Sequence, residues 1–146
     1  FGPVLPMITF DKREEVERMR KFGEAIGMAF QIQDDILDFQ RDNNTGKPSN
    51  NDLREKKITL PMLEVMERKS EEERRVMLDL LKRASEDESA VDELHRIVVE
   101  GGGPELAAET MHAYIHRAMH HASKYPDTPY RRAMLDLCTF IAERDR

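Results

Sequence analysis

The sequence has few of the features that mark secreted, membrane-spanning or nucleic-acid-binding proteins. Its 146 residues include one cysteine and no tryptophan, so an intrachain disulfide is impossible and nothing points to secretion. No apolar run approaches the roughly 20 residues that a membrane-spanning helix needs. Acidic residues (29) outnumber basic ones (23), which argues against a general nucleic-acid binder because such proteins need a basic surface. We therefore expect a cytoplasmic protein that has no transmembrane segment and binds no nucleic acid.

Apolar residues nevertheless make up 39% of the chain, enough for a core, and their spacing is helical. No stretch shows the sustained alternation of a β-strand, so the expected fold class is all-α. Asn, Gly, Pro and Lys predict a loop at 42–58, and the glycines at 101–103 are expected to end a helix. About six helices are expected. The first two cover about 12–41 and 60–68, and a third begins after the Ser70 cap. The last three include 91–98, about 104–124 and the residues after 129.

The first expected helix is apolar around most of its circumference, which is typical of a central, buried helix. Its remaining stripe consists of Gly23, Gly27, Gln31, Asp34 and Asp38, with Asp35 at the edge. Buried carboxylates are costly unless they are paired or bind a metal ion. The stripe is therefore expected to line a cavity.

The three aspartates form the pattern D-D-x-x-D, in which positions i and i+4 of a helix face the same way. Carboxylate oxygens suit Mg²⁺, which keeps several waters and usually bridges carboxylates to substrate phosphates. The alternative is an acidic helix face that meets only water. Taken alone, Asp34, Asp35 and Asp38 are a weak signal for a metal site.

The loop that follows combines a carboxylate with cations that suit phosphate, namely Lys47, Asp52, Arg54, Lys56 and Lys57. On composition alone, a solvated charged loop is the favoured explanation of this run. Together with the acidic helix, however, the loop favours the binding of a Mg²⁺–diphosphate group.

Three spaced segments carry a resemblance to a known family. They are G-M-A-F-Q-I-Q-D-D-I-L-D-F at 27–39, G-K-P at 46–48 and D-L-R-E-K-K-I-T-L-P at 52–61. In this order they resemble the second aspartate-rich motif and the lysine-bearing loop of the trans-polyprenyl diphosphate synthases. The segments at 126–134 and 142–146 resemble the long-chain, octaprenyl-type members. The resemblance covers nearly the whole chain and implies an isoprenoid synthase fold, a helical bundle.

The resemblance implies that Asp34 and Asp38 bind Mg²⁺ at the allylic diphosphate, with Asp35 as a nearby ligand or supporting group. It also assigns catalytic roles to Lys47 and Lys57, which would contact the diphosphate directly. The implied reaction is the elongation of an allylic prenyl diphosphate by isopentenyl diphosphate through ionisation and 1′-4 condensation. Its product is expected to feed quinone side chains.

Further substrate-binding roles are implied for three residues. Phe30 would pack near the reacting prenyl unit, Gln31 would lie beside the aspartates, and Asp52 would orient the loop. The terminal Arg144 and Arg146 would help to close the site. For the glycines of the stripe, close helix packing is the favoured explanation, and room for part of the hydrocarbon tail is the alternative.

The chain departs from the family in two respects. The family pattern E-G-K has lysine in place of glycine here, at Lys56. The chain also contains a single D-D-x-x-D, whereas the family has an earlier one. Residues 1–146 are thus expected to be the C-terminal part of one synthase domain, inactive without the N-terminal half and dimeric as a whole. The alternatives are a non-catalytic helical subunit or diphosphate-binding module, and a class I terpene cyclase.

Two other features are not expected to carry function. His112, His116 and His120 follow one another at helical spacing, away from the apolar side of their helix, and should form an exposed polar face rather than a zinc site. Cys138 lies among core-spaced residues and is expected to be a buried apolar side chain.

Overall fold

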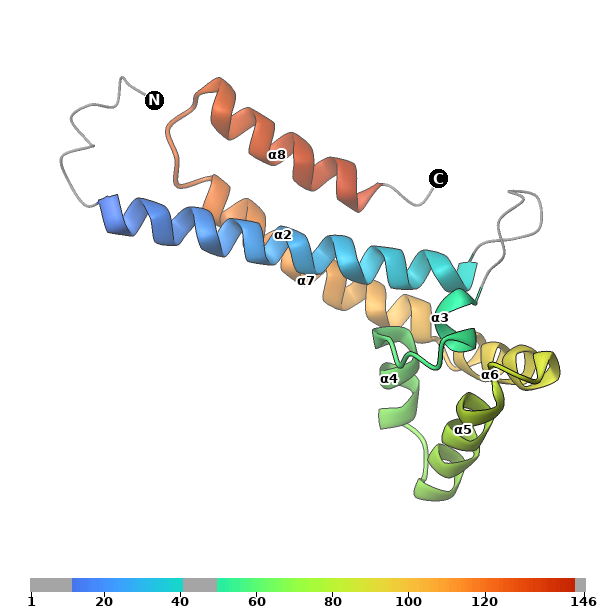
Figure 1. The fold of residues 1–146 in the computed structure, drawn as a ribbon. Coiled ribbons are helices and arrows are strands. Elements are labelled where there is room, and N and C mark those ends of the chain that lie inside the picture. The colour runs from blue at the N-terminus through green and yellow to red at the C-terminus, as the bar shows by residue number, and fades with distance from the viewer. Residues whose placement is uncertain (1–11, 41–49, 144–146) are drawn as a thin grey trace. The chain divides into compact units, whose positions relative to one another are not determined.

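The computed structural model describes residues 12–40 and 50–143, and every regular element in these ranges is an α-helix, as expected (Figure 1). The helices are α2 (Lys12–Gln40), α3 (Asn51–Arg54), α4 (Leu60–Glu67), α5 (Glu71–Arg83), α6 (Glu88–Glu100), α7 (Gly103–Ala122) and α8 (Pro129–Ala142). The short α3 lies inside the predicted loop and corrects that prediction. Within the described ranges, no helix is both long and apolar enough to cross a membrane.

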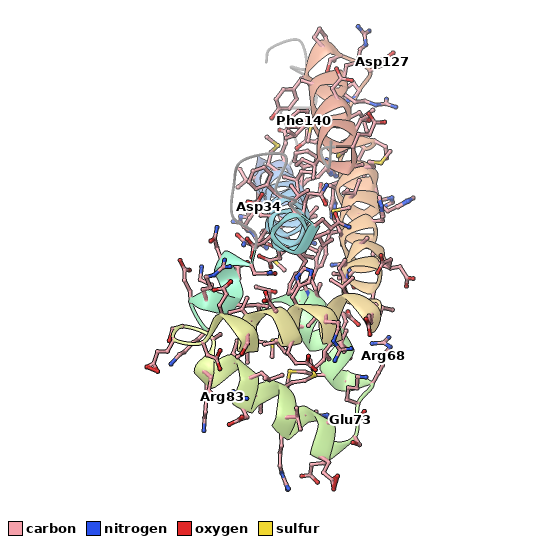
Figure 2. The ribbon with its side chains drawn as sticks, turned by 90° about the vertical axis from the view of Figure 1, so that its right-hand side faces the viewer. Asp34, Arg68, Glu73, Arg83, Asp127 and Phe140 are labelled. Carbon is pink, nitrogen blue, oxygen red and sulfur yellow. The ribbon has the colours of Figure 1, made fainter. Side chains whose placement is uncertain are left out.

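Local sequence signals place several helix ends. The predicted capping box is confirmed: the Ser70 hydroxyl accepts a hydrogen bond from the Glu73 amide (3.2 Å), and the Glu73 carboxylate accepts one from the Ser70 amide (3.0 Å). Glu73 and Arg83 mark the first and last turns of α5, where their charges complement the helix dipole (Figure 2). At the start of α8, the Thr128 hydroxyl caps the helix by accepting a hydrogen bond from the Arg131 amide.

The chain divides into two compact units. One contains α2 up to Phe30, α7 from His112, and α8; the other contains the rest of α2, α3 to α6, and the start of α7. The second unit has a continuous apolar core formed by Phe39, Leu53, Met62, Val65, Met77, Leu80, Leu81, Ala84, Ala90, Val91, Leu94 and Val98. This core joins the end of α2 to α3, α4, α5 and α6, and so fixes the elements that carry most of the predicted site.

In the first unit, α2 is buried on one side only. Phe22 and Ala29 are buried, whereas Val16, Met19 and Phe30 are exposed, Val16 to 65%. The prediction of a helix buried all round is therefore wrong for this part of α2. A helix becomes buried all round only with neighbours on every side, and the described residues of this unit supply α7 and α8 alone.

Two minor predictions are confirmed by burial. The side chains of His112, His116 and His120 are exposed along α7. Cys138 has no exposed surface, and burial raises the pKa of its thiol.

The glycine run between α6 and α7 both ends one helix and begins the next. Gly101 follows the last residue of α6, Gly102 has a left-handed φ of 79°, and Gly103 is already the first residue of α7. A Cβ atom on Gly103 would lie 2.6 Å from the carbonyl oxygen of Pro61 and 2.7 Å from a methyl group of Val98. The start of α7 thus packs on the start of α4 more closely than any side chain would allow.

Gly103→Ala should lower the free energy of unfolding by about 1–3 kcal/mol, because the backbone of α4 must move to admit the methyl group. Gly23→Ala is the matched control, since a Cβ atom there meets no atom within 4 Å. The control should gain about 0.5–1 kcal/mol from its better helix propensity. Urea unfolding of both variants checks this, and equal stabilities would contradict it.

Candidate functional site

The three aspartates of D-D-x-x-D occupy the last turns of α2, and their environments differ. Asp34 and Asp35 are half-buried, whereas Asp38 is only 5% exposed (Figure 2 labels Asp34). Within residues 12–40 and 50–143, no three His, Cys, Asp or Glu side chains converge to hold a metal ion by themselves. The carboxylates of Asp34 and Asp35 nevertheless fit Mg²⁺, because this ion usually keeps several waters and takes further oxygen ligands from a phosphate.

The buried carboxylate of Asp38 binds the start of α3. Its Oδ1 accepts a hydrogen bond from the Asn51 amide (3.2 Å), and its Oδ2 accepts one from the Asp52 amide (3.0 Å). The backbone carbonyl of Asp38 accepts a third from the Asn50 amide (3.0 Å). These bonds offset the cost of burying the charge, and they attach the lysine-bearing segment to the acidic turn.

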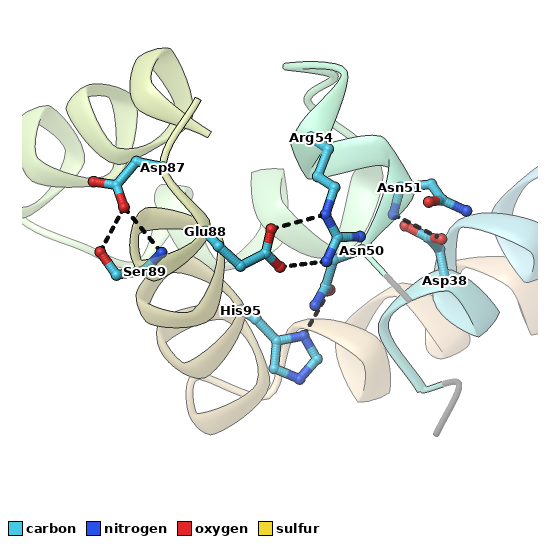
Figure 3. Close-up of polar contacts among 8 residues, drawn as sticks. All are labelled: Asp38, Asn50, Asn51, Arg54, Asp87, Glu88, Ser89 and His95. Carbon is cyan, nitrogen blue, oxygen red and sulfur yellow. Dashed lines mark hydrogen bonds and ion pairs between the residues drawn. The ribbon is translucent and has the colours of Figure 1, made fainter. Parts of the chain in front are cut away.

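Helix α6 contacts α3 at both ends (Figure 3). Before α3, the Oδ1 of Asn50 lies 2.7 Å from the Nδ1 of His95. At the end of α3, the Nε and a terminal nitrogen of Arg54 bind the two carboxylate oxygens of Glu88, at 3.2 and 2.5 Å. The His95 ring also stacks on Phe39, with centroids 5.9 Å apart. Burial lowers the pKa of His95 below its ordinary value. Because an amide oxygen can only accept, the Nδ1 of His95 is the donor in its hydrogen bond with Asn50.

The chain turns back directly after α3 and presents Lys57 beside Asp52. The Lys57 amide donates to the Asp52 carbonyl (2.8 Å), and the Lys57 ammonium lies 3.9 Å from an Asp52 carboxylate oxygen. Lys56 forms the turn in a left-handed conformation, with a φ of 60°. This is the position where the family pattern has glycine, so lysine here adopts a backbone conformation that glycine favours.

Asp35 has the most altered acidity in the site. Its pKa is raised to about 6, mainly by burial and to a smaller extent by the nearby carboxylates of Asp52 and Asp34. A hydrogen bond from the Gln31 amide (3.3 Å) and the charge of Lys57 act in the opposite direction. The acidic turn of α2 and the segment after α3 are therefore close enough to form one electrostatic cluster.

The structure thus brings together most of the residues predicted for the site, namely Gln31, Asp34, Asp35, Asp38, Asp52 and Lys57. Phe30 belongs to the other compact unit and is 44% exposed. Lys47, Arg144 and Arg146 lie outside the described residues. Asn50 and His95 were not among the residues predicted for the site. For Asn50, the tolerance of asparagine for a left-handed backbone is the sequence signal for the turn before α3.

Gly23 and Gly27 lie in a groove of about 580 Å³ in the first unit. A Cβ atom on either glycine would meet no atom within 4 Å. Met28, Tyr114 and Arg117 also line this groove. The expected close helix packing is therefore wrong for the described residues, and room for part of a hydrocarbon tail stays a prediction.

Comparisons with known proteins agree with the resemblance. A sequence model of the family described as Polyprenyl synthetase matches residues 4–98. The short chain isoprenyl diphosphate synthase of Methanothermobacter thermautotrophicus is 32% identical over 90% of this chain and 40% of its own length. The nonaprenyl diphosphate synthase of Mycobacterium tuberculosis is 33% identical over 90% of this chain and 39% of its own length.

The fold has a counterpart among solved structures. The crystal structure of a polyprenyl synthase from Caulobacter crescentus, complexed with calcium and isoprenyl diphosphate, matches with a TM-score of 0.76 at 27% identity. The match covers 89% of this chain and 40% of that one. The chain thus spans about 40% of the length of the proteins that it matches.

Lys56→Gly should raise the free energy of unfolding by about 0.5–1 kcal/mol, because glycine adopts a left-handed backbone without the Cβ strain of lysine. Lys124→Gly, in a turn where φ is not positive, is the control and should be destabilising. Thermal or urea unfolding measures both. If Lys56→Gly loses as much stability as the control, the backbone of Lys56 is not strained.

Asp35 should titrate with an apparent pKa of about 6 when its carboxyl carbon is followed by NMR. Because this folded-state pKa lies above the ordinary value of 3.8, ionisation of Asp35 disfavours the folded state as the pH rises from 3.8 towards 6. Asp35→Asn should therefore gain stability relative to the parent chain over that window. An unshifted titration, or parallel stability curves, would show that the group is not buried in this way.

Proposed function

Because the chain belongs to the polyprenyl synthetase family, we propose that it supplies the Mg²⁺- and allylic-diphosphate-binding part of a trans-prenyltransferase. The observation that carries the proposal is the cluster of Asp34, Asp35, Asp52 and Lys57, which places carboxylates and an ammonium group side by side. Such a set suits a diphosphate with its metal ion, since the anion needs cations and the metal ion needs carboxylates.

Asp34 and Asp38, one turn apart on α2, would hold the metal ion, with Asp35 as a nearby ligand or supporting group, and Asp38 would also anchor α3. Bound Mg²⁺ would supply charge neutralisation for the departing diphosphate. Lys57 would donate hydrogen bonds to the diphosphate oxygens, and Lys47 is proposed to do the same. Stabilising the charge that develops on the leaving group lowers the barrier to ionisation of the allylic carbon–oxygen bond.

The condensation needs a second substrate and a dry site. We propose that isopentenyl diphosphate attacks the allylic cation through its double bond and then loses a proton. Phe30 would pack near the reacting prenyl unit and keep water away from the cation. The Caulobacter crescentus structure was solved with calcium and isoprenyl diphosphate, which supports a divalent metal ion and a prenyl diphosphate as ligands of this site.

The whole enzyme is proposed to be a homodimer that includes an N-terminal half with the first aspartate-rich motif. The N-terminal half is inferred from the single D-D-x-x-D and from the share of its relatives that the chain spans, whereas the homodimer rests on the family resemblance alone. The relatives include short-chain and nonaprenyl synthases, so the long-chain, quinone-directed product rests on the C-terminal resemblance.

One observation favours a second candidate, a non-catalytic helical subunit or diphosphate-binding module. The acidic turn and the lysine segment lie within one compact unit, an arrangement that supports a self-contained diphosphate-binding module. A class I terpene cyclase is disfavoured by the lysine segment, which belongs to the synthase pattern.

Calorimetry with Mg²⁺ and inorganic pyrophosphate tests the proposed site directly. Lys57→Gln should weaken binding about tenfold or more, because it removes a charged hydrogen bond to the anion. Lys82→Gln, on the exposed surface of α5, is the matched control and should change nothing. Absence of Mg²⁺-dependent binding by the parent chain, or equal affinities of both variants, would contradict the proposal.

The same preparation separates the two candidates. With isopentenyl diphosphate and an allylic diphosphate, the 146-residue chain alone should form no product. Addition of the N-terminal half should restore product formation. Product without any addition would overturn the predicted inactivity. Binding without turnover in the reconstituted protein would favour the non-catalytic module.

A further inference from the structure

Helix α3 is attached to α6 by two side-chain contacts that differ in exposure. Arg54 binds Glu88, whose side chain is 61% exposed. Asn50, by contrast, is only 7% exposed where its amide oxygen meets His95 (Figure 3). An exposed ion pair adds little stability, whereas a buried amide that loses its partner is costly. The contact between Asn50 and His95 is therefore the stronger attachment.

Apolar packing alone does not determine how α3 is oriented. Leu53 is fully buried and fixes how deeply α3 sits in the core. A single buried side chain leaves the short helix free to rotate about that point. The orientation must come from directional contacts, which are the hydrogen bonds from the Asn51 and Asp52 amides to Asp38 and the side-chain hydrogen bond between Asn50 and His95.

The backbone of Asn50 determines where the following amides point. Its φ of 63° reverses the chain direction, and its own amide donates to the Asp38 carbonyl. The next amides, those of Asn51 and Asp52, then fall on the two carboxylate oxygens of Asp38. A side chain that holds Asn50 in this conformation therefore also sets the segment that ends at Lys57.

We infer that His95 is a positioning residue, which holds Asn50 so that α3 binds Asp38 and places Asp52 and Lys57 beside the acidic turn. His95 bonds to the side chain of Asn50, so its effect on Asp52 and Lys57 passes through Asn50. The consequence for ligand binding rests on the proposed function, whereas the effect on α3 does not.

His95→Leu is the test, because leucine keeps an apolar side chain against Phe39 but cannot donate to Asn50. Hydrogen exchange of the Asn51 and Asp52 amides should accelerate about tenfold relative to core amides, because Asn50 would be buried without its partner. The dissociation constant for inorganic pyrophosphate with Mg²⁺ should rise at least about threefold, since the loss of one orienting hydrogen bond misplaces Lys57. His95→Asn, whose amide can replace Nδ1 as the donor, should restore much of both.

Two controls separate positioning from general loss of stability. Val98→Ala removes buried apolar atoms from the same helix and should accelerate exchange uniformly without changing pyrophosphate affinity. Glu88→Ala removes the acceptor of the exposed attachment and should change exchange at Asn51 and Asp52 by less than about twofold.

A local loss of protection in His95→Leu, rescued by His95→Asn, supports the inference. Unchanged exchange at Asn51 and Asp52, or an equal local loss in Val98→Ala, overturns it. If the parent chain binds no pyrophosphate, the proposed function fails, and the exchange experiment still decides whether His95 positions α3.

Discussion

The bonds between Asp38 and three consecutive amides are the contacts on which the candidate site depends. A carboxylate that is 5% exposed would be costly in an apolar core, and the amides of Asn51 and Asp52 make it tolerable. The carboxylate also fixes how the segment that begins at α3 is oriented against the last turn of α2. The Asp38 side chain thereby holds the acidic turn of α2 and the lysine-bearing segment after α3 close together.

Apolar and polar contacts contribute differently to the position of α3. Leu53 and its neighbours supply the free energy that keeps α3 on the core, since burial of apolar surface is the larger and less directional contribution. The polar contacts around Asp38, Asn50 and His95 supply direction. Asp34 and Asp35 remain half-buried, and this partial exposure is what a ligand-binding group requires.

Helix type and several helix ends could be predicted because their causes are local. The Ser70–Glu73 capping box, the apolar spacing of α6 and the D-D-x-x-D turn all lie within a few residues of what they determine. Asn50 and His95 are 45 residues apart, and their hydrogen bond produces no periodic pattern in the sequence, so the sequence could not indicate it. Burial all round α2 failed for a similar reason, since spacing indicates which faces are apolar but not whether a neighbour covers them.

The backbone conformation of Lys56 affects how members of this family can be recognised by sequence motif. Its backbone takes the conformation that glycine adopts most easily, because the hydrogen bonds from the Lys56 and Lys57 amides to α3 impose that turn. The turn is therefore specified by its hydrogen-bond geometry, and the identity of residue 56 is secondary. A search that demands E-G-K as an invariant string would pass over this chain, whereas a search for the turn itself would retain it.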